Sequence, residues 1–221
     1  MEYSFSWSTL IEHYLPILWG IKDTFLISGA IIGLAMTQGL FLCLARLSGS
    51  RILGSLAVLW VEAFRNIPRI VLLLWAYYCT SIYLKMEFVT PWMAAIAALS
   101  LQEGAYTAEI FRAGIEVVHK GEVEAGRSIG LSYLQIMRKI VFPQAVRTTV
   151  PALTNEFVWC IKTSTIASII GVSDLLYYAK MLSDQTFHPI EFYAITALIY
   201  FLICWGISTL ARLLNKKMAV Y

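Results

Sequence analysis

The stretch TFLISGAIIGLAMTQGLFLCLA, residues 24–45, contains no charged side chain. As an α-helix of 22 residues it would be about 33 Å long, which is enough to cross the roughly 30 Å hydrocarbon layer of a membrane. A cleaved signal peptide does not fit, because the apolar run is longer than the hydrophobic region of such peptides and starts after residue 20. The stretch therefore predicts a membrane-spanning helix.

The whole composition agrees with this prediction, since 59% of the 221 residues are hydrophobic and only 14% are charged. The cysteines and histidines are scattered, without the spacing of a disulfide framework or a metal site, so we interpret the cysteines as core or lipid-facing residues. A net charge of +3 gives no indication of nucleic-acid binding. The cysteines and histidines are Cys43, Cys79, Cys160, Cys204, His13, His119 and His188.

Four further apolar regions follow, so the sequence predicts an all-α membrane protein with five spans and no long linker or repeat. Residues 1–22 alternate aromatic, aliphatic and polar side chains, which favours a helix in the membrane interface. The second apolar region, 52–83, is interrupted by charged residues and Pro68, so we expect its inner end to be a kinked or separate helix. The predicted spans are residues 24–45, 67–81, 90–111, 151–172 and 189–210.

Cations fall mainly on one side of this arrangement, which predicts the orientation. The other side holds Lys22, Lys85 and Lys180, and Lys162 lies within a span. By the positive-inside rule the cation-rich side is cytoplasmic, so we expect the N-terminus outside and the C-terminus inside. The cytoplasmic cations are Arg46, Arg51, Arg65, Arg69, Arg112, Lys120, Arg127, Arg138, Lys139, Arg147, Arg212, Lys216 and Lys217.

The polar segment 118–143 lies on the cytoplasmic side of this arrangement. Gly130 separates two short predicted helices, Ser132 is a suitable N-cap for the second, and Pro143 is expected to end it. One interpretation is an ordinary amphipathic connector packed under its own bundle. However, its apolar surface exceeds what a thin loop can bury alone, which favours a partner. That surface comprises Ala125, Ile129, Tyr133, Ile136, Met137 and Ile140.

The segment resembles the cytoplasmic "EAA loop" of permease subunits in ATP-binding cassette (ABC) importers. That pattern is Glu-Ala-Ala, three residues, Gly, nine residues, Ile, one residue, Leu-Pro. The chain keeps every spacing and departs at Gly126, where the second Ala is usual, and at Phe142, where Leu is usual. Four other stretches resemble polar amino acid permeases of the histidine, glutamine and arginine type. They are residues 64–68, 104–115, 151–157 and 169–176.

This resemblance implies that residues 1–221 form one type I ABC importer transmembrane domain in the cell (inner) membrane. The EAA loop would be a coupling helix that sits in a groove of a separate ATPase dimer, and ATP and Mg would bind there. The chain has no phosphate-binding G-x-x-x-x-G-K-[ST] sequence and would not itself be an enzyme or hold a cofactor. A second permease chain, the same or paralogous, and an external substrate-binding protein are the other implied partners. The coupling residues would be Glu124, Ala125, Gly126, Gly130, Ile140 and Pro143.

Polar groups at membrane depth are costly, so they are the candidates for the cargo site. The cargo implied by the resemblance is a polar amino acid, whose two charges Lys162 could complement together with Glu156 or Glu103. We expect Glu109 to pair with Arg112 instead. The candidates are Gln102, Glu103, Tyr106, Asn155, Glu156, Trp159, Lys162 and Thr163.

Several alternatives remain open. The family commonly has Asp after the lysine where this chain has Thr163, which argues mildly against a strongly cationic cargo. An opine or another small amine is an alternative cargo, and the partner permease could hold the cargo instead. A secondary transporter fits poorly, because no inverted repeat is detectable. An intramembrane serine protease fits worse, because no histidine lies at membrane depth.

Overall fold

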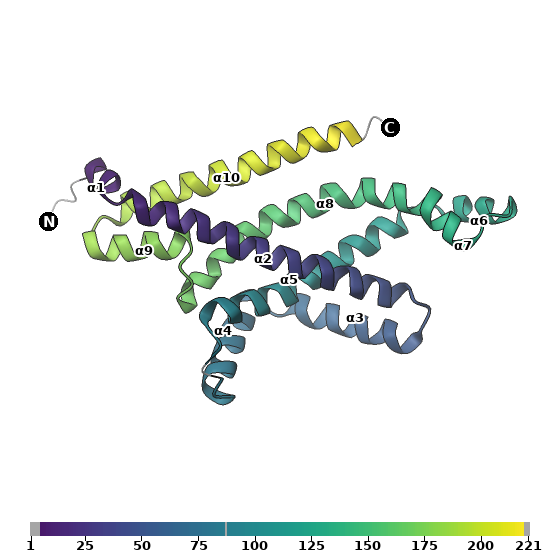
Figure 1. Cartoon of the computed structure of the whole chain (residues 1–221), viewed down its shortest axis with the longest axis horizontal. Helices are drawn as coiled ribbons and strands as arrows, with labels where there is room; N and C mark the ends of the chain where they lie inside the picture. Colours follow the sequence, from purple (N-terminus) through teal and green to yellow (C-terminus); the bar gives the residue numbers. More distant parts are fainter. Residues whose placement is uncertain (1–4, 87, 219–221) are drawn as a thin grey trace. The chain divides into compact units, whose positions relative to one another are not determined.

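The computed structural model describes residues 5–86 and 88–218, and these form helices and connecting segments without a β-strand, which confirms the all-α prediction (Figure 1). Two π-helical turns and one 3₁₀ stretch interrupt the helices. The α-helices are α1 (Trp7–Glu12), α2 (Tyr14–Leu47), α3 (Arg51–Asn66), α4 (Arg69–Tyr78), α5 (Pro91–Glu116), α6 (Lys120–Ser128), α7 (Tyr133–Ile136), α8 (Phe142–Thr163), α9 (Leu175–Thr186) and α10 (Pro189–Met218).

Length and apolar composition mark α2 and the Pro189–Leu213 part of α10 as candidate membrane spans. The bent pair formed by Tyr133–Ile170 and α9 is a third candidate, with an angle of 48° at its break. A shorter apolar helix covers Arg69–Tyr83. The five-span arrangement therefore stays a prediction.

Two helix boundaries differ from the sequence-based expectation. Helix α2 begins at Tyr14, ten residues before residue 24, because neither Lys22 nor Asp23 interrupts a helix and Pro16 is tolerated in a first turn. The expectation that Pro143 ends a helix is wrong, because the chain stays helical through it into α8. A π-helical turn at Met137–Val141 precedes the proline, and its altered hydrogen-bond register accommodates the ring and the missing N–H.

The chain divides into two compact units. The first is built from the chain up to Gly33, from Ile67–Ser100 and from Val158–Gly206. Its core includes Ile17 of α2, Leu175 and Leu182 of α9 and Phe192 of α10, and Figure 1 shows these three helices together.

Helix α9 begins with a fully buried carboxylate. The Asp174 Oδ1 atom accepts a hydrogen bond of 2.8 Å from the Tyr177 backbone N–H and so caps the helix. Close by, the Leu175 N–H donates to the Thr24 hydroxyl at 3.1 Å. Burial of Asp174 raises the pKa of its carboxyl from the ordinary 3.8 to about 7, because burial disfavours the charged form.

This raised pKa predicts a pH-dependent stability. Because the folded-state pKa lies above the unfolded value, the contribution is complete below about pH 4 and is lost as the pH rises through about 7. Asp174→Asn keeps the capping oxygen but cannot ionise. We therefore expect the melting temperature of the purified protein to fall less between pH 5 and pH 8 in this variant than in the wild type. Equal pH dependence in both proteins would contradict the prediction.

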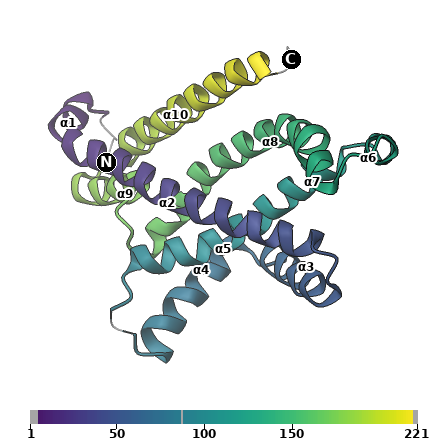
Figure 2. The same ribbon diagram turned by 45° about the vertical axis from the view of Figure 1, so that its right-hand side comes forward.

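The second unit contains Leu34–Asn66, Leu101–Phe157 and the chain from Ile207. Here the second half of α2 runs beside α3 (Figure 2), and both contact α5 through a buried cluster of small and aliphatic side chains. Helix α5 also approaches α8 closely, since a Cβ atom on Gly114 would lie 2.0 Å from the Thr149 hydroxyl. The cluster is formed by Leu42, Ala57, Val61, Ala105 and Ala108.

Candidate functional site

The EAA segment begins with α6, which ends in a glycine-dependent motif. Gly130 has a φ of +81°, a conformation that favours glycine. The Gly130 N–H donates to the Arg127 carbonyl at 2.9 Å and the Leu131 N–H to the Gly126 carbonyl at 3.1 Å. These two bonds form a Schellman motif, which fixes where the chain leaves the helix.

A capping box then starts α7. The Ser132 hydroxyl accepts from the Gln135 N–H, and the Gln135 side-chain oxygen accepts from the Ser132 N–H at 2.9 Å. This is the N-cap predicted at Ser132, and each side chain satisfies a backbone N–H that would otherwise lack a partner. Together, the Schellman motif and the capping box define the turn between α6 and α7.

The apolar side chains of the segment divide into two groups. Ile136 and Val141 are buried with Val118, and Ile140 packs against this cluster. In contrast, Ile129, Tyr133 and Leu134 are 77%, 71% and 73% exposed. Exposed apolar side chains grouped on one segment are typical of a protein-binding surface, and Ile129, Tyr133 and Leu134 form such a group.

The six predicted coupling residues do not all lie on that surface. Gly126 is buried, and a Cβ there would lie 2.9 Å from the Ile140 Cδ1 atom, so both residues pack inside the segment. Helical spacing alone could not show which apolar residues the segment buries itself. The exposed members of the predicted set are Glu124, Ala125, Gly130 and Pro143.

Two substitutions at Gly126 should therefore have opposite effects. In Gly126→Ala, the Ile140 methyl can turn aside and the helix gains up to about 1 kcal/mol, so we expect unchanged transport and an equal or higher melting temperature. In Gly126→Leu, the longer side chain overpacks the cluster by about 1–3 kcal/mol, which should lower the melting temperature and transport. Loss of transport in the alanine variant would contradict this packing argument.

A polar cavity of about 330 Å³ lies within the second unit. Its charged and aromatic lining comes from three helices. These residues are Arg65 of α3, Tyr106, Glu109 and Arg112 of α5, and Glu156 of α8. The Arg65 guanidinium carbon lies 5.4 Å from the centre of the Tyr106 ring, a cation–π distance. The Tyr106 hydroxyl donates to the Arg65 carbonyl at 3.3 Å, so Arg65 and Tyr106 hold each other in place.

An ion-pair chain closes one side of this cavity. Glu109 pairs with Arg46 of α2 and with Arg112, whose Nη2 lies 2.7 Å from the Glu109 Oε2. Arg112 also pairs with Glu116. The expected pairing of Glu109 with Arg112 is thus confirmed, and these four charges compensate one another.

The candidate cargo residues separate into groups. Tyr106 and Glu156 line the polar cavity. Gln102 is buried and donates to the Phe64 carbonyl at 2.9 Å, Glu103 is 2% exposed, and Asn155 is exposed. The three residues predicted to share a helical face therefore have different surroundings. Gln102 makes a structural contact, whereas Tyr106 and Glu109 line the cavity.

The remaining candidates lie in the first unit. Thr163 accepts a hydrogen bond of 2.9 Å from Arg69, and the Arg69 guanidinium carbon lies 5.9 Å from the centre of the Trp159 ring. Lys162 is exposed. The sequence analysis did not name Arg65 or Arg69 as candidate site residues, although Arg65 belongs to the stretch 64–68. A cation close to a proline near a predicted span is the sequence signal that could have identified both.

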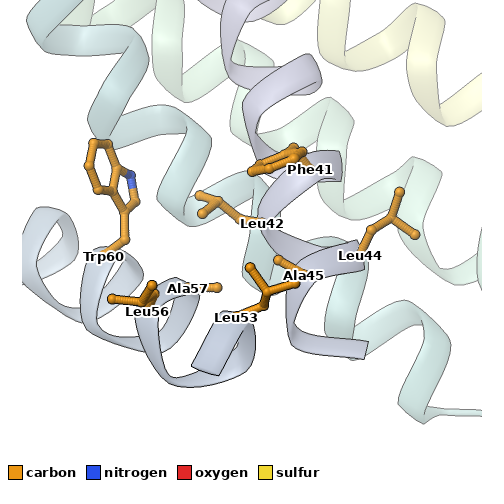
Figure 3. Close-up of a pocket in the computed structure, with 8 residues that line it drawn as sticks. All are labelled: Phe41, Leu42, Leu44, Ala45, Leu53, Leu56, Ala57 and Trp60. Atoms are coloured by element: carbon orange, nitrogen blue, oxygen red, sulfur yellow. The ribbon is translucent and has the colours of Figure 1, made fainter. Parts of the chain in front are cut away.

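A second cavity, in the second unit, has a different chemistry. It measures about 480 Å³ and lies between α2 and α3, where Figure 3 shows only hydrocarbon side chains and one indole around it. A charged solute would find no compensating group there. The cavity is lined by Phe41, Leu42, Leu44, Ala45, Leu53, Leu56, Ala57 and Trp60.

Comparisons with known proteins agree with one family. Residues 29–220 match the family described as "Binding-protein-dependent transport system inner membrane component". The chain is 38% identical to the "Probable amino-acid ABC transporter permease protein YckA" of Bacillus subtilis, over 100% of this chain and 96% of that protein. It is 33% identical to the nopaline transport system permease protein NocM of Agrobacterium fabrum, over 92% and 88% of the two chains.

Solved structures agree as well. The crystal structure of an amino acid ABC transporter with histidines superposes with a TM-score of 0.92 at 31% identity, covering 97% of this chain and 100% of that one. The MetNI methionine transporter, at 19% identity and a TM-score of 0.71, shares the fold. The resemblance inferred from the EAA loop is thus confirmed. The chain belongs to the family of binding-protein-dependent transport system inner membrane components and is the permease subunit of an ABC transporter, in which ATP hydrolysis lies on a separate subunit.

Proposed function

We propose that this permease passes a polar amino acid from an external binding protein into the cytoplasm by alternating access. The observation that carries the proposal is the polar cavity with Arg65 and Glu156 in its lining, because a zwitterionic amino acid has one complementary charge for each. The names of the relatives, an amino-acid permease and a nopaline permease, support the same class of cargo. An opine remains the second candidate because of the nopaline relative.

The partners follow from the same proposal. A dimer of ATPase subunits binds ATP and Mg and contacts the exposed Ile129, Tyr133 and Leu134. By moving this segment, the dimer switches the permease between inward-facing and outward-facing states. A second permease chain, identical or paralogous, completes the path. The N-terminus lies outside and the C-terminus in the cytoplasm, as the distribution of cations indicates.

Reconstitution tests the proposal. The complex carrying a tag on this chain is placed in vesicles with its binding protein, and uptake of each of the 20 standard amino acids and of nopaline is measured with and without ATP. We expect ATP-dependent accumulation of one polar amino acid and none after removal of the ATPase. Accumulation against a gradient by vesicles without the ATPase would instead indicate a gradient-driven transporter.

The individual cargo residues need a separate measurement. Lys162 is a second candidate contact for the cargo carboxylate besides Arg65, and Lys162→Met should weaken cargo binding to the detergent-solubilised complex if Lys162 makes that contact. Unchanged affinity would remove Lys162 from the cargo site and leave the polar cavity of the second unit as the remaining candidate. Gln102, Glu103, Asn155, Trp159 and Thr163 are candidates for the same measurement.

A further inference from the structure

Two opposite charges share the polar cavity without neutralising each other. Arg65 on α3 and Glu156 on α8 both line the cavity, yet within residues 5–86 and 88–218 no ion pair joins them. Each presents a buried polar atom that has no hydrogen-bond partner in that part of the chain, namely the Arg65 Nε and the Glu156 Oε1. Such atoms are costly unless a ligand or water satisfies them.

The other charges of the cavity are already compensated. Glu109 and Arg112 are held in the ion-pair chain with Arg46 and Glu116. Within the described residues, Arg65 has one ion pair, a long contact of 3.9 Å with Glu62, whose side chain is 57% exposed. The cavity therefore offers one cationic end and one anionic end.

We propose that Arg65 determines selectivity for cargo with a free α-carboxylate, which its guanidinium binds while Glu156 binds the α-ammonium group. This inference rests on the proposed function and assigns one end of the cargo to each residue. A guanidinium donates paired hydrogen bonds to a carboxylate in a fixed plane. Tyr106 acts as a positioning residue, because its ring lies against the Arg65 guanidinium and its hydroxyl donates to the Arg65 backbone carbonyl.

The size of the cavity suits a small cargo. Its volume of about 330 Å³ lies at the lower end of the roughly 300–1,000 Å³ of small-molecule sites. A single amino acid fits this volume, so the cavity has room for a cargo that carries both charges.

Binding of matched analogues to the isolated complex tests the proposal. The complex is purified in detergent through a tag on this chain, without the binding protein, and the amino acid that binds tightest among the 20 standard ones is chosen. Its α-amide lacks the carboxylate and its des-amino analogue lacks the ammonium group. We expect the wild type to prefer the amino acid over either analogue by about tenfold or more.

Each substitution should remove one preference only. In Arg65→Gln, the affinity for the amino acid should fall about tenfold while that for the α-amide stays constant, so the carboxylate preference disappears. In Glu156→Gln, the preference over the des-amino analogue should disappear instead. Arg65→Lys keeps the positive charge but lacks the planar guanidinium, so it should retain an intermediate carboxylate preference. This variant tests the proposal if Arg65→Gln does not assemble.

Glu62→Gln is the matched control. It removes the charge that contacts Arg65 but does not line the cavity, so both preferences should persist. The inference is overturned if Arg65→Gln keeps the full carboxylate preference, or if no standard amino acid binds at about 10 mM to a complex that transports. Failure of the proposed function is a different result, namely no ATP-dependent uptake of any amino acid by the wild type.

Discussion

Replacing Gly130 by valine should reduce ATP-driven transport about tenfold or more in a complex that still assembles. The φ of +81° at this position costs a residue with a Cβ about 1–2 kcal/mol, and more when the side chain is β-branched. The simplest relief is a turn with another backbone geometry, which breaks the bonds of Gly130 and Leu131 to the end of α6. The exposed Ile129 and Tyr133 would then lose their fixed relation to α6.

The measurement compares uptake with the ATPase rate that cargo-loaded binding protein stimulates. Valine should lower both, because the ATPase subunits no longer move the permease through a segment of defined shape. Gly130→Asn is the matched control, since asparagine tolerates left-handed backbone conformations better than other residues with a side chain, and it should keep most of the transport. If Gly130→Val showed wild-type uptake and a wild-type stimulated ATPase rate, the Schellman motif would not contribute to transport.

The turn at Gly130 was predictable from the sequence, because a glycine between two short helices indicates where the first helix ends. Ser132 was likewise predictable, since an N-cap residue followed three positions later by Gln135 is a local signal. Pro143 misled the prediction, because the π-helical turn before it has no sequence signature of its own. Local signals therefore predicted the start of α7 and not its continuation into α8.

The cargo residues show a different limit. Helical spacing placed Gln102, Tyr106 and Glu109 on one face, but it could not show what that face contacts. Gln102 meets the Phe64 carbonyl, and Glu109 meets two arginines, one of them 63 residues earlier in the chain. The role proposed for Arg65 could not be predicted from the sequence, because it depends on helices α3, α5 and α8 meeting at one cavity. Such tertiary contacts are not encoded in any single stretch.

Replacing Gly39 by alanine should destabilise the second unit by about 1–3 kcal/mol, although alanine is the better helix former. A Cβ at Gly39 would lie 2.7 Å from the Thr107 Cβ and Cγ2 atoms and 3.0 Å from the Ala108 N–H nitrogen. Thr107 and Ala108 are buried in α5, so neither can move aside without shifting the helix. Small residues allow helices in membranes to approach this closely, and the added methyl group would push α2 away from α5.

Gly33→Ala on the same helix separates this packing effect from helix propensity. Among the described residues, no atom apart from the neighbouring backbone of α2 lies within 4 Å of a Cβ built at Gly33, so this variant should gain up to about 1 kcal/mol. Thermal unfolding of the two purified variants in one detergent should therefore shift in opposite directions relative to the wild type. Because Cys43 lies one turn beyond Gly39 and is fully buried, its reaction with a maleimide should also become faster in Gly39→Ala only. Equal melting temperatures for both variants, with Cys43 protected, would mean that α2 and α5 do not approach each other through Gly39.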